Sequence, residues 1–138
     1  MKLACKAIFL SEEKLLLQHR DNNDKIWSPN HWGFFGGMAD LKETPETCLI
    51  REIKEELQIN CEIIKKIHEC MHEESNTKNI FFFTNTKDKI INSNLKEGQD
   101  FGWFLISEIE KMLITWDTKI FLKFLSNNKL NIKNIKNF

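Results

Sequence analysis

The stretch Gly37–Ile59, GMADLKETPETCLIREIKEELQI, decides the fold. Its second half predicts a helix over residues 45–57. Thr44 can cap the first turn, Pro45 suits the start of a helix, and Glu46 complements the positive end of the helix dipole. At 100° per residue, this helix has one apolar face that can dock on a sheet, made of Ile50, Ile53 and Leu57.

The same helix carries three acids on a separate face. Glu52, Glu55 and Glu56 fall within an arc of about 100°. Each like-charge pair at i+3 or i+4 costs about 0.2–0.5 kcal/mol, and anions are also disfavoured at the negative end of a helix. The acids therefore form either a solvated acidic face or a site for a hard cation such as Mg²⁺. Upstream, Gly36-Gly37 offers backbone that can approach a metal or a phosphate closely.

The spacing of these residues resembles the Nudix box, GX5EX7REUXEEXGU, where U is aliphatic. Gly37, Glu43 and Arg51 begin its three parts, and every defined position matches except the late glycine, which is Gln58 here. The resemblance implies an α/β/α sandwich with a mixed β-sheet, in which the box forms a loop–helix–loop motif.

The resemblance also implies a reaction. Water attacks a phosphorus of a nucleoside diphosphate linked to another group, so the substrate is a nucleoside triphosphate, oxidised or not, or a nucleotide sugar. Mg²⁺ is the implied cofactor, with Mn²⁺ as a substitute, and the implied partner is a small nucleotide. The alternative, suggested by Gln58, is a catalytically weak nucleotide-binding regulator on the same scaffold.

Roles for individual residues follow from the same resemblance. Glu52, Glu55 and Glu56 are the metal-binding and catalytic acids, and one of them, or a Glu outside the box, is the general base. Arg51 orients carboxylates, with Glu43 as its partner. Further metal ligands are the Gly36 carbonyl and Glu97, while a simple loop acid is an equal alternative for Glu97. The candidates for substrate contact are Trp27, His31, Phe35 and Gly37, although core packing is the commoner role for aromatic residues such as Phe35.

Gln58 predicts a change in the way the helix ends. Glycine at this position would permit a left-handed residue, which is more costly for glutamine. We therefore expect the helix to run on slightly and end at Asn60, without loss of the chemistry, because Gln58 supplies no ligand.

Composition limits the remaining possibilities. A chain of 138 residues predicts one domain over residues 1–138. Lys and Arg total 20 and so do Asp and Glu, so no overall field draws the protein to nucleic acid or to an anionic membrane. No stretch reaches the length of a spanning helix, the first ten residues are too short for a secretory signal, and four cysteines without CxxC spacing suggest a reduced, cytoplasmic protein. Whether the protein is a homodimer stays open, because nothing in the sequence marks an interface.

The rest of the chain predicts strands and two further helices. Strands are expected at 3–10, 14–20, 61–70, 79–84 and 100–105, and helices start at Ser107 and Asp117. His68, Cys70 and His72 alternate along one strand, where they are either soft-metal ligands or ordinary strand residues near a substrate cleft.

Overall fold

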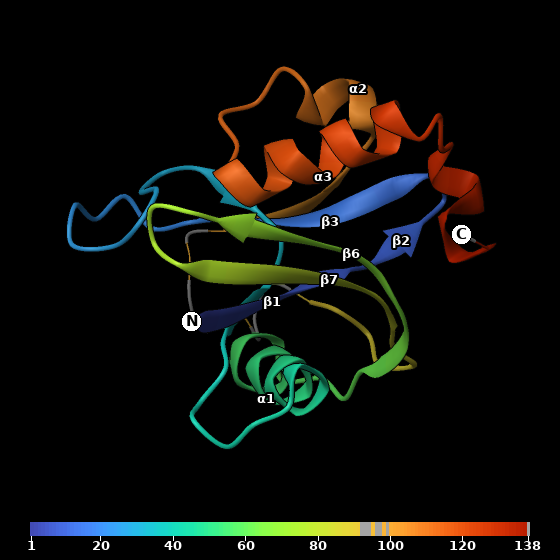
Figure 1. The fold of residues 1–138 in the computed structure, drawn as a ribbon. Coiled ribbons are helices and arrows are strands. Elements are labelled where there is room, and N and C mark those ends of the chain that lie inside the picture. Colours follow the sequence, from blue (N-terminus) through green and yellow to red (C-terminus); the bar gives the residue numbers. More distant parts are fainter. Residues whose placement is uncertain (92–94, 96–97, 99, 138) are drawn as a thin grey trace.

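The computed structural model describes residues 1–91, 95, 98 and 100–137. It contains two four-stranded sheets, with helices on either side (Figure 1). The first sheet has the order β5-β1-β7-β6, and the second has the order β2-β3-β4 with β8 paired to β3. The strands are β1 (Lys2–Ile8), β2 (Leu10–Ser11), β3 (Lys14–His19), β4 (Trp32–Gly33), β5 (Gly36–Met38), β6 (Glu62–His72), β7 (Thr77–Asn85) and β8 (Asp100–Phe104).

The first sheet is mixed, as predicted. β1 runs parallel to β7, whereas β5 pairs antiparallel with β1 and β6 pairs antiparallel with β7. One helix, α1 (Pro45–Leu57), covers one face of this sheet, and α3 (Trp116–Asn127) lies on the opposite side, near α2 (Ile106–Ile109) (Figure 1). The predicted α/β/α class with a mixed sheet is therefore confirmed.

Two apolar clusters hold these layers together. One packs α1 against the first sheet through Leu49, Ile53 and Leu57. The other packs α3 against the opposite side through Phe121, Phe124 and Leu125. The sheet thus lies between two cores, and each helix is oriented by its own buried stripe.

The capping prediction for α1 is confirmed, but one residue of its apolar face is placed differently. The Thr44 side chain accepts a hydrogen bond from the backbone N–H of Thr47, and the Thr47 hydroxyl accepts one from the backbone N–H of Thr44. The prediction that Ile50 packs in the core is wrong, because it is 42% exposed. Cys48 and Leu49 are buried instead, so the face that meets the sheet is rotated from the one expected.

The end of α1 also differs from the prediction. Gln58 itself takes the left-handed conformation, with φ 60° and ψ 35°, and its backbone N–H donates to Lys54 O. The Gln58 side chain donates to the carbonyls of Lys54 and Glu55, at 3.1 Å each. The expectation that the helix runs on to Asn60 is therefore wrong, because the side-chain amide binds two carbonyls that the helix end leaves free.

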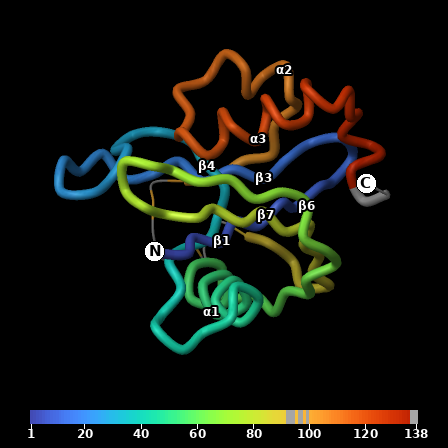
Figure 2. Tube along the Cα trace, viewed as in Figure 1, coloured from blue at the N-terminus to red at the C-terminus, as the bar shows by residue number. Residues whose placement is uncertain are grey.

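The other predicted strands and helices lie within about two residues of their predicted ranges, whereas β4 and β5 match no predicted strand. The C-terminal segment is packed. It forms a 3-10 helix over Ile132–Asn137, in which Ile132 and Ile135 are buried against the α3 core. Figure 2 shows this segment turning back beside the ends of β2 and β3. Within the described residues, no helix has the length and apolar character needed to cross a membrane.

Candidate active site

Arg51 is the centre of the acidic face of α1. Its Nε and Nη2 donate to the two carboxylate oxygens of Glu43, at 2.7 and 2.9 Å. Its Nη1 lies 3.0 Å from Glu52 Oε1 and 3.2 Å from Glu55 Oε2. The Met38 carbonyl accepts from Nη2 at 3.2 Å. One guanidinium thus joins the loop before α1 to Glu52 and Glu55 on the helix, by the fork geometry that favours arginine over lysine.

Glu43 is fixed as the permanent anion of this network. The hydrogen bond from Arg51 and the backbone N–H of Asp40 hold the pKa of Glu43 at about 2. The same contact with Glu43 raises the pKa of Arg51 above its ordinary value. Both groups therefore stay charged near neutral pH, where neither is suited to proton transfer.

Glu52, Glu55 and Glu56 differ in their exposure to solvent. The side chain of Glu55 is 58% exposed and that of Glu52 is 17% exposed, whereas Glu56 retains only 2% exposure. The three carboxylates thus extend from the solvent-exposed side of the helix to the side that packs on the sheet. Because Glu56 is buried, the interpretation as a solvated acidic face does not apply to it.

Two glycines bring backbone against these acids. A Cβ on Gly37 would overlap the carboxylate of Glu52. A Cβ on Gly36, whose φ is +148°, would overlap the carbonyl of Cys5. Only glycine allows β5 to pair with β1 here while a glutamate carboxylate lies directly on its surface.

This donor set suits a hard divalent cation. The space that Gly37 leaves open is filled by the Glu52 carboxylate, and Mg²⁺ prefers oxygen ligands. Among the described residues, no group of three or more His, Cys, Asp or Glu side chains is close enough together to hold a metal ion. Arg51 lies between Glu52 and Glu55 instead, and its Nη1 contacts both carboxylates.

The predicted substrate contacts are dispersed. Trp27 is 81% exposed on the loop between β3 and β4, where Arg20 holds its carbonyl with two hydrogen bonds of 3.0 and 2.8 Å. His31 is partly buried, with Nδ1 2.8 Å from the carbonyl of Pro29. Glu97 lies outside the described residues.

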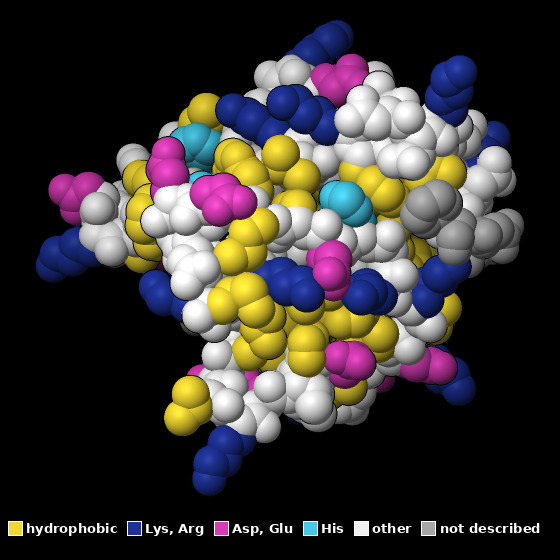
Figure 3. Space-filling model, in the orientation of Figure 1, with side chains coloured by type: hydrophobic (Ala, Val, Ile, Leu, Met, Phe, Trp, Pro, Cys, Tyr) yellow, Lys and Arg dark blue, Asp and Glu magenta, His cyan; other side chains and the backbone are white. Residues whose placement is uncertain are grey.

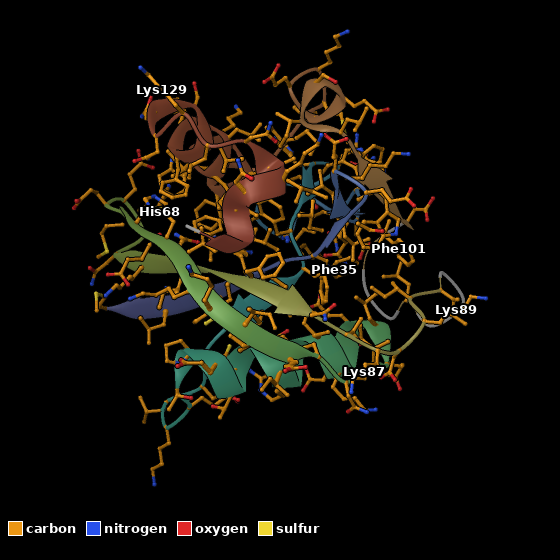
Figure 4. The ribbon with its side chains drawn as sticks, turned by 90° about the vertical axis from the view of Figure 1, so that its right-hand side faces the viewer. Phe35, His68, Lys87, Lys89, Phe101 and Lys129 are labelled. Atoms are coloured by element: carbon orange, nitrogen blue, oxygen red, sulfur yellow. The ribbon has the colours of Figure 1, made fainter. Side chains whose placement is uncertain are left out.

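Phe35 lies in the core. Its ring is fully buried and meets Phe101 edge to face, with centroids 6.2 Å apart (Figure 4). Direct contact with a substrate would require this ring to be uncovered, so the structure favours its role in packing the strand that leads into Gly36.

One contact near the site had no signal in the sequence. Cys48 in α1 is fully buried, and its thiol lies 3.7 Å from the Gly37 carbonyl. Cys5, which lies opposite Gly37 in the ladder of β1 and β5, is buried beside it, and burial raises the pKa of both thiols. Helical periodicity placed Cys48 on α1, but only the packing of helix on sheet shows that it touches the glycine.

A groove lies on another part of the surface. Its volume is about 560 Å³, and it lies between the start of α1 and strands β6 and β7, with Lys65, Lys66 and Lys78 among its lining residues. Figure 3 shows apolar, basic and acidic side chains intermingled on this side of the molecule. None of the three acids discussed above lines this groove.

His68 and His72, two of the alternating residues of β6, contact different aromatic side chains of α3. His68 stacks on Phe124 of α3 with centroids 4.1 Å apart, and burial lowers the pKa of its imidazole. His72 meets Trp116 edge to face at 4.6 Å, and its Nδ1 lies 2.7 Å from the Ser75 hydroxyl. These contacts describe strand residues that pack against α3.

Comparison with protein families identifies one domain. The family model for the NUDIX domain matches residues 2–124. A search of curated proteins gives no significant match.

Solved structures share the fold. The solution structure of the E. coli ORF135 protein is 22% identical with a TM-score of 0.70, covering 91% of this chain and 89% of that one. The MutT NUDIX hydrolase from Burkholderia pseudomallei is 21% identical with a TM-score of 0.66, covering 88% of this chain and 95% of that one. An ADP-ribose pyrophosphatase from Streptococcus suis is 18% identical with a TM-score of 0.64, covering 83% and 79%.

Proposed function

The chain belongs to the Nudix domain family, and from that premise we propose that it is a Mg²⁺-dependent pyrophosphohydrolase that cleaves a nucleoside diphosphate linked to another group. The substrate class is a nucleoside triphosphate, oxidised or not, or a nucleotide sugar. A single observation carries the proposal: Arg51 binds Glu43 through two nitrogens and contacts Glu52 and Glu55 through the third.

The residues of the site divide into ligands and supports. Glu52, Glu55 and Glu56, with the Gly36 carbonyl as a further donor, would hold the cation, and Mn²⁺ could replace Mg²⁺ there. Bound divalent cations supply charge neutralisation for the diphosphate and lower the pKa of a water molecule. Arg51 and Glu43 support this group by fixing carboxylate orientation, which preserves the geometry for in-line attack at phosphorus.

Proton removal from the attacking water needs a carboxylate that is free to accept it. Glu43 is unsuitable, because its pKa of about 2 makes it a weak base and both of its oxygens are bound to Arg51. Both oxygens of Glu55 also accept from Arg51 Nη1, at the longer distances of 3.3 and 3.2 Å, but its side chain is 58% exposed, the most among Glu52, Glu55 and Glu56, so we propose it as the general base.

The test is hydrolysis of a panel of nucleoside triphosphates, nucleotide sugars, ADP-ribose and dinucleoside polyphosphates in the presence of Mg²⁺. Glu55→Gln and Glu56→Gln should each lower kcat at least about 100-fold while the proteins remain folded. Lys54→Gln, on an exposed neighbouring position of the same helix, is the matched control and should retain activity. Wild-type rates in both glutamine variants would contradict the proposal.

The alternative of a nucleotide-binding regulator remains as an outcome of this test. It would be supported by nucleotide binding to the metal-loaded protein without turnover of any member of the panel. Its motivation was Gln58, yet this residue reaches the left-handed conformation that a glycine would have taken. The end of α1 therefore gives no structural reason for weak catalysis.

The proposed partner is a small nucleotide and not a nucleic acid polymer, since acidic and basic residues are equal in number at 20 each. The four cysteines are free, in keeping with the proposed cytoplasmic location.

A further inference from the structure

Gly37 of β5 is contacted by two side chains of α1 that lie about one helical turn apart. The carboxylate of Glu52 fills the space in which a Cβ on Gly37 would lie. The thiol of Cys48 donates a hydrogen bond to the Gly37 carbonyl at 3.7 Å. Residues four apart share one face of a helix, so both contacts depend on the same placement of α1 against β5.

A second thiol supports this contact. Cys5 of β1 lies opposite Gly37 in the ladder with β5, and both cysteines are fully buried. Burial raises the pKa of both thiols, and the hydrogen bond between them adds to this rise for Cys5 but opposes it for Cys48. These opposite effects identify Cys5 as the donor and Cys48 as the acceptor. The S–H of Cys48 is therefore left for the Gly37 carbonyl, and two thiols in series connect β1 to β5.

The orientation of Gly37 matters because the preceding residue supplies a proposed ligand. The Gly36 carbonyl carbon is bonded to the nitrogen of Gly37, so both belong to one planar peptide unit. Neither residue has a Cβ, and glycine has the least restricted backbone of all residues. A contact in addition to the ladder with β1 therefore restricts this pair, and the Cys48 thiol supplies it from the helix that carries Glu52.

We propose that Cys48 is a positioning residue of the divalent-cation site, because its thiol holds Gly37 in the orientation that lets the Gly36 carbonyl and the Glu52 carboxylate bind one ion. The inference rests on the proposed function, since it concerns the cation that the acids of α1 would hold. Cys48 is fully buried, so it acts through Gly37 and not by contact with the substrate. The competing explanation is packing alone, because a buried free cysteine also behaves as a small apolar residue.

Three substitutions separate the hydrogen bond from the packing. Cys48→Ser keeps a donor, Cys48→Val fills the space without a donor, and Cys48→Ala removes both. A neutral hydrogen bond changes an equilibrium by about tenfold at most, and a thiol is a weak donor. We therefore expect Cys48→Val and Cys48→Ala to weaken Mn²⁺ binding about 3- to 10-fold, whereas Cys48→Ser should stay within about twofold of wild type.

The experiment measures Mn²⁺ binding by calorimetry on the full chain without nucleotide, with a melting curve for each protein. Cys70→Ala is the matched control and should bind Mn²⁺ as wild type does, because it removes a partly buried thiol of β6 that packs against the α3 core. In steady-state hydrolysis, the Mg²⁺ concentration for half-maximal rate should rise by the same factor as the Mn²⁺ dissociation constant. The value of kcat at saturating Mg²⁺ should change less than about threefold, because the ligands themselves remain.

Equal Mn²⁺ affinity in wild type and Cys48→Val would overturn the inference, as would a Cys48→Ser variant that binds Mn²⁺ no better than Cys48→Ala. If Cys48→Ser does not fold, the comparison of Cys48→Val with wild type decides. Hydrolysis of the substrate panel with equal Mn²⁺ binding in all variants would overturn this inference alone. The expected order of Mn²⁺ binding without hydrolysis of any nucleotide would overturn the proposed activity alone.

Discussion

Replacement of Arg51 by lysine tests whether the acids of α1 depend on one guanidinium for their arrangement. The substitution keeps the positive charge but replaces three nitrogens in a fixed plane by one. In the native protein these nitrogens bind Glu43 at 2.7 and 2.9 Å, and contact Glu52 at 3.0 Å and Glu55 at 3.2 Å. A single ammonium can keep one of the three carboxylates in such contact, so at least two charge-assisted hydrogen bonds are lost.

The magnitude follows from those two bonds. Hydrogen bonds to charged groups contribute about 1.5–3 kcal/mol each, and the lower value applies because the side chain of Arg51 is 30% exposed. The total of about 3 kcal/mol corresponds to a decrease of about 150-fold in the population of correctly arranged sites. We therefore expect kcat/KM to fall by about two orders of magnitude and the Mg²⁺ concentration for half-maximal rate to rise.

The assay is steady-state hydrolysis of the best substrate of the panel over a range of Mg²⁺ concentrations, with a thermal unfolding curve for each protein. Lys54→Gln removes a charge from the same helix and should change kcat/KM by less than threefold. If Arg51→Lys retains more than a third of the wild-type kcat/KM, the acids are positioned by other contacts and the reasoning fails.

Further changes around the same site have separate outcomes. Gly37→Ala should lower kcat at least about 100-fold, measured with saturating metal, because its Cβ would displace the carboxylate of Glu52. An activity near that of wild type would show that the position of this carboxylate does not depend on Gly37. Gln58→Gly should leave the free energy of unfolding within about 1 kcal/mol of wild type in a denaturant titration and leave turnover unchanged, since the relief of a left-handed residue is offset by the loss of two side-chain hydrogen bonds, and a large gain in rate would contradict this. Glu43, whose pKa is lowered from 4.5 to about 2 by Arg51, stabilises the fold above pH 4.5 and loses that contribution as pH falls from 4.5 toward 2. Glu43→Gln should accordingly flatten the fall in melting temperature over that range, and a slope equal to that of wild type would show that another group is responsible.

The fold could be predicted from the sequence wherever one local rule acted alone. Thr44 and Pro45 predicted the start of α1, and the structure begins the helix there. The rule failed for Ile50, because periodicity cannot say how far a helix is rotated on its sheet when Leu49 competes for the same face. It also failed for Gln58, where side-chain hydrogen bonds to two carbonyls offset the cost of a left-handed residue.

The sequence identified the residues of the candidate site, but it did not predict the contacts that they make with other segments. The resemblance to the Nudix box implied that Arg51 pairs with Glu43, and the structure shows this contact through two nitrogens. The burial of Glu56 and the thiol of Cys48 on the Gly37 carbonyl depend on how α1 lies against β1 and β5, which no spacing within one segment specifies. Long-range packing therefore determines the part of the site that sequence patterns leave open.

Glu56 is buried where local energetics would expose an acid. It lies near the C-terminal end of α1, where the helix dipole disfavours anions, and it retains only 2% exposure. The placement does not improve the packing of the helix, since an apolar residue is less costly to bury than a carboxylate. Such a cost is retained where a ligand binds, and a cation held by Glu52, Glu55 and Glu56 would stabilise this carboxylate.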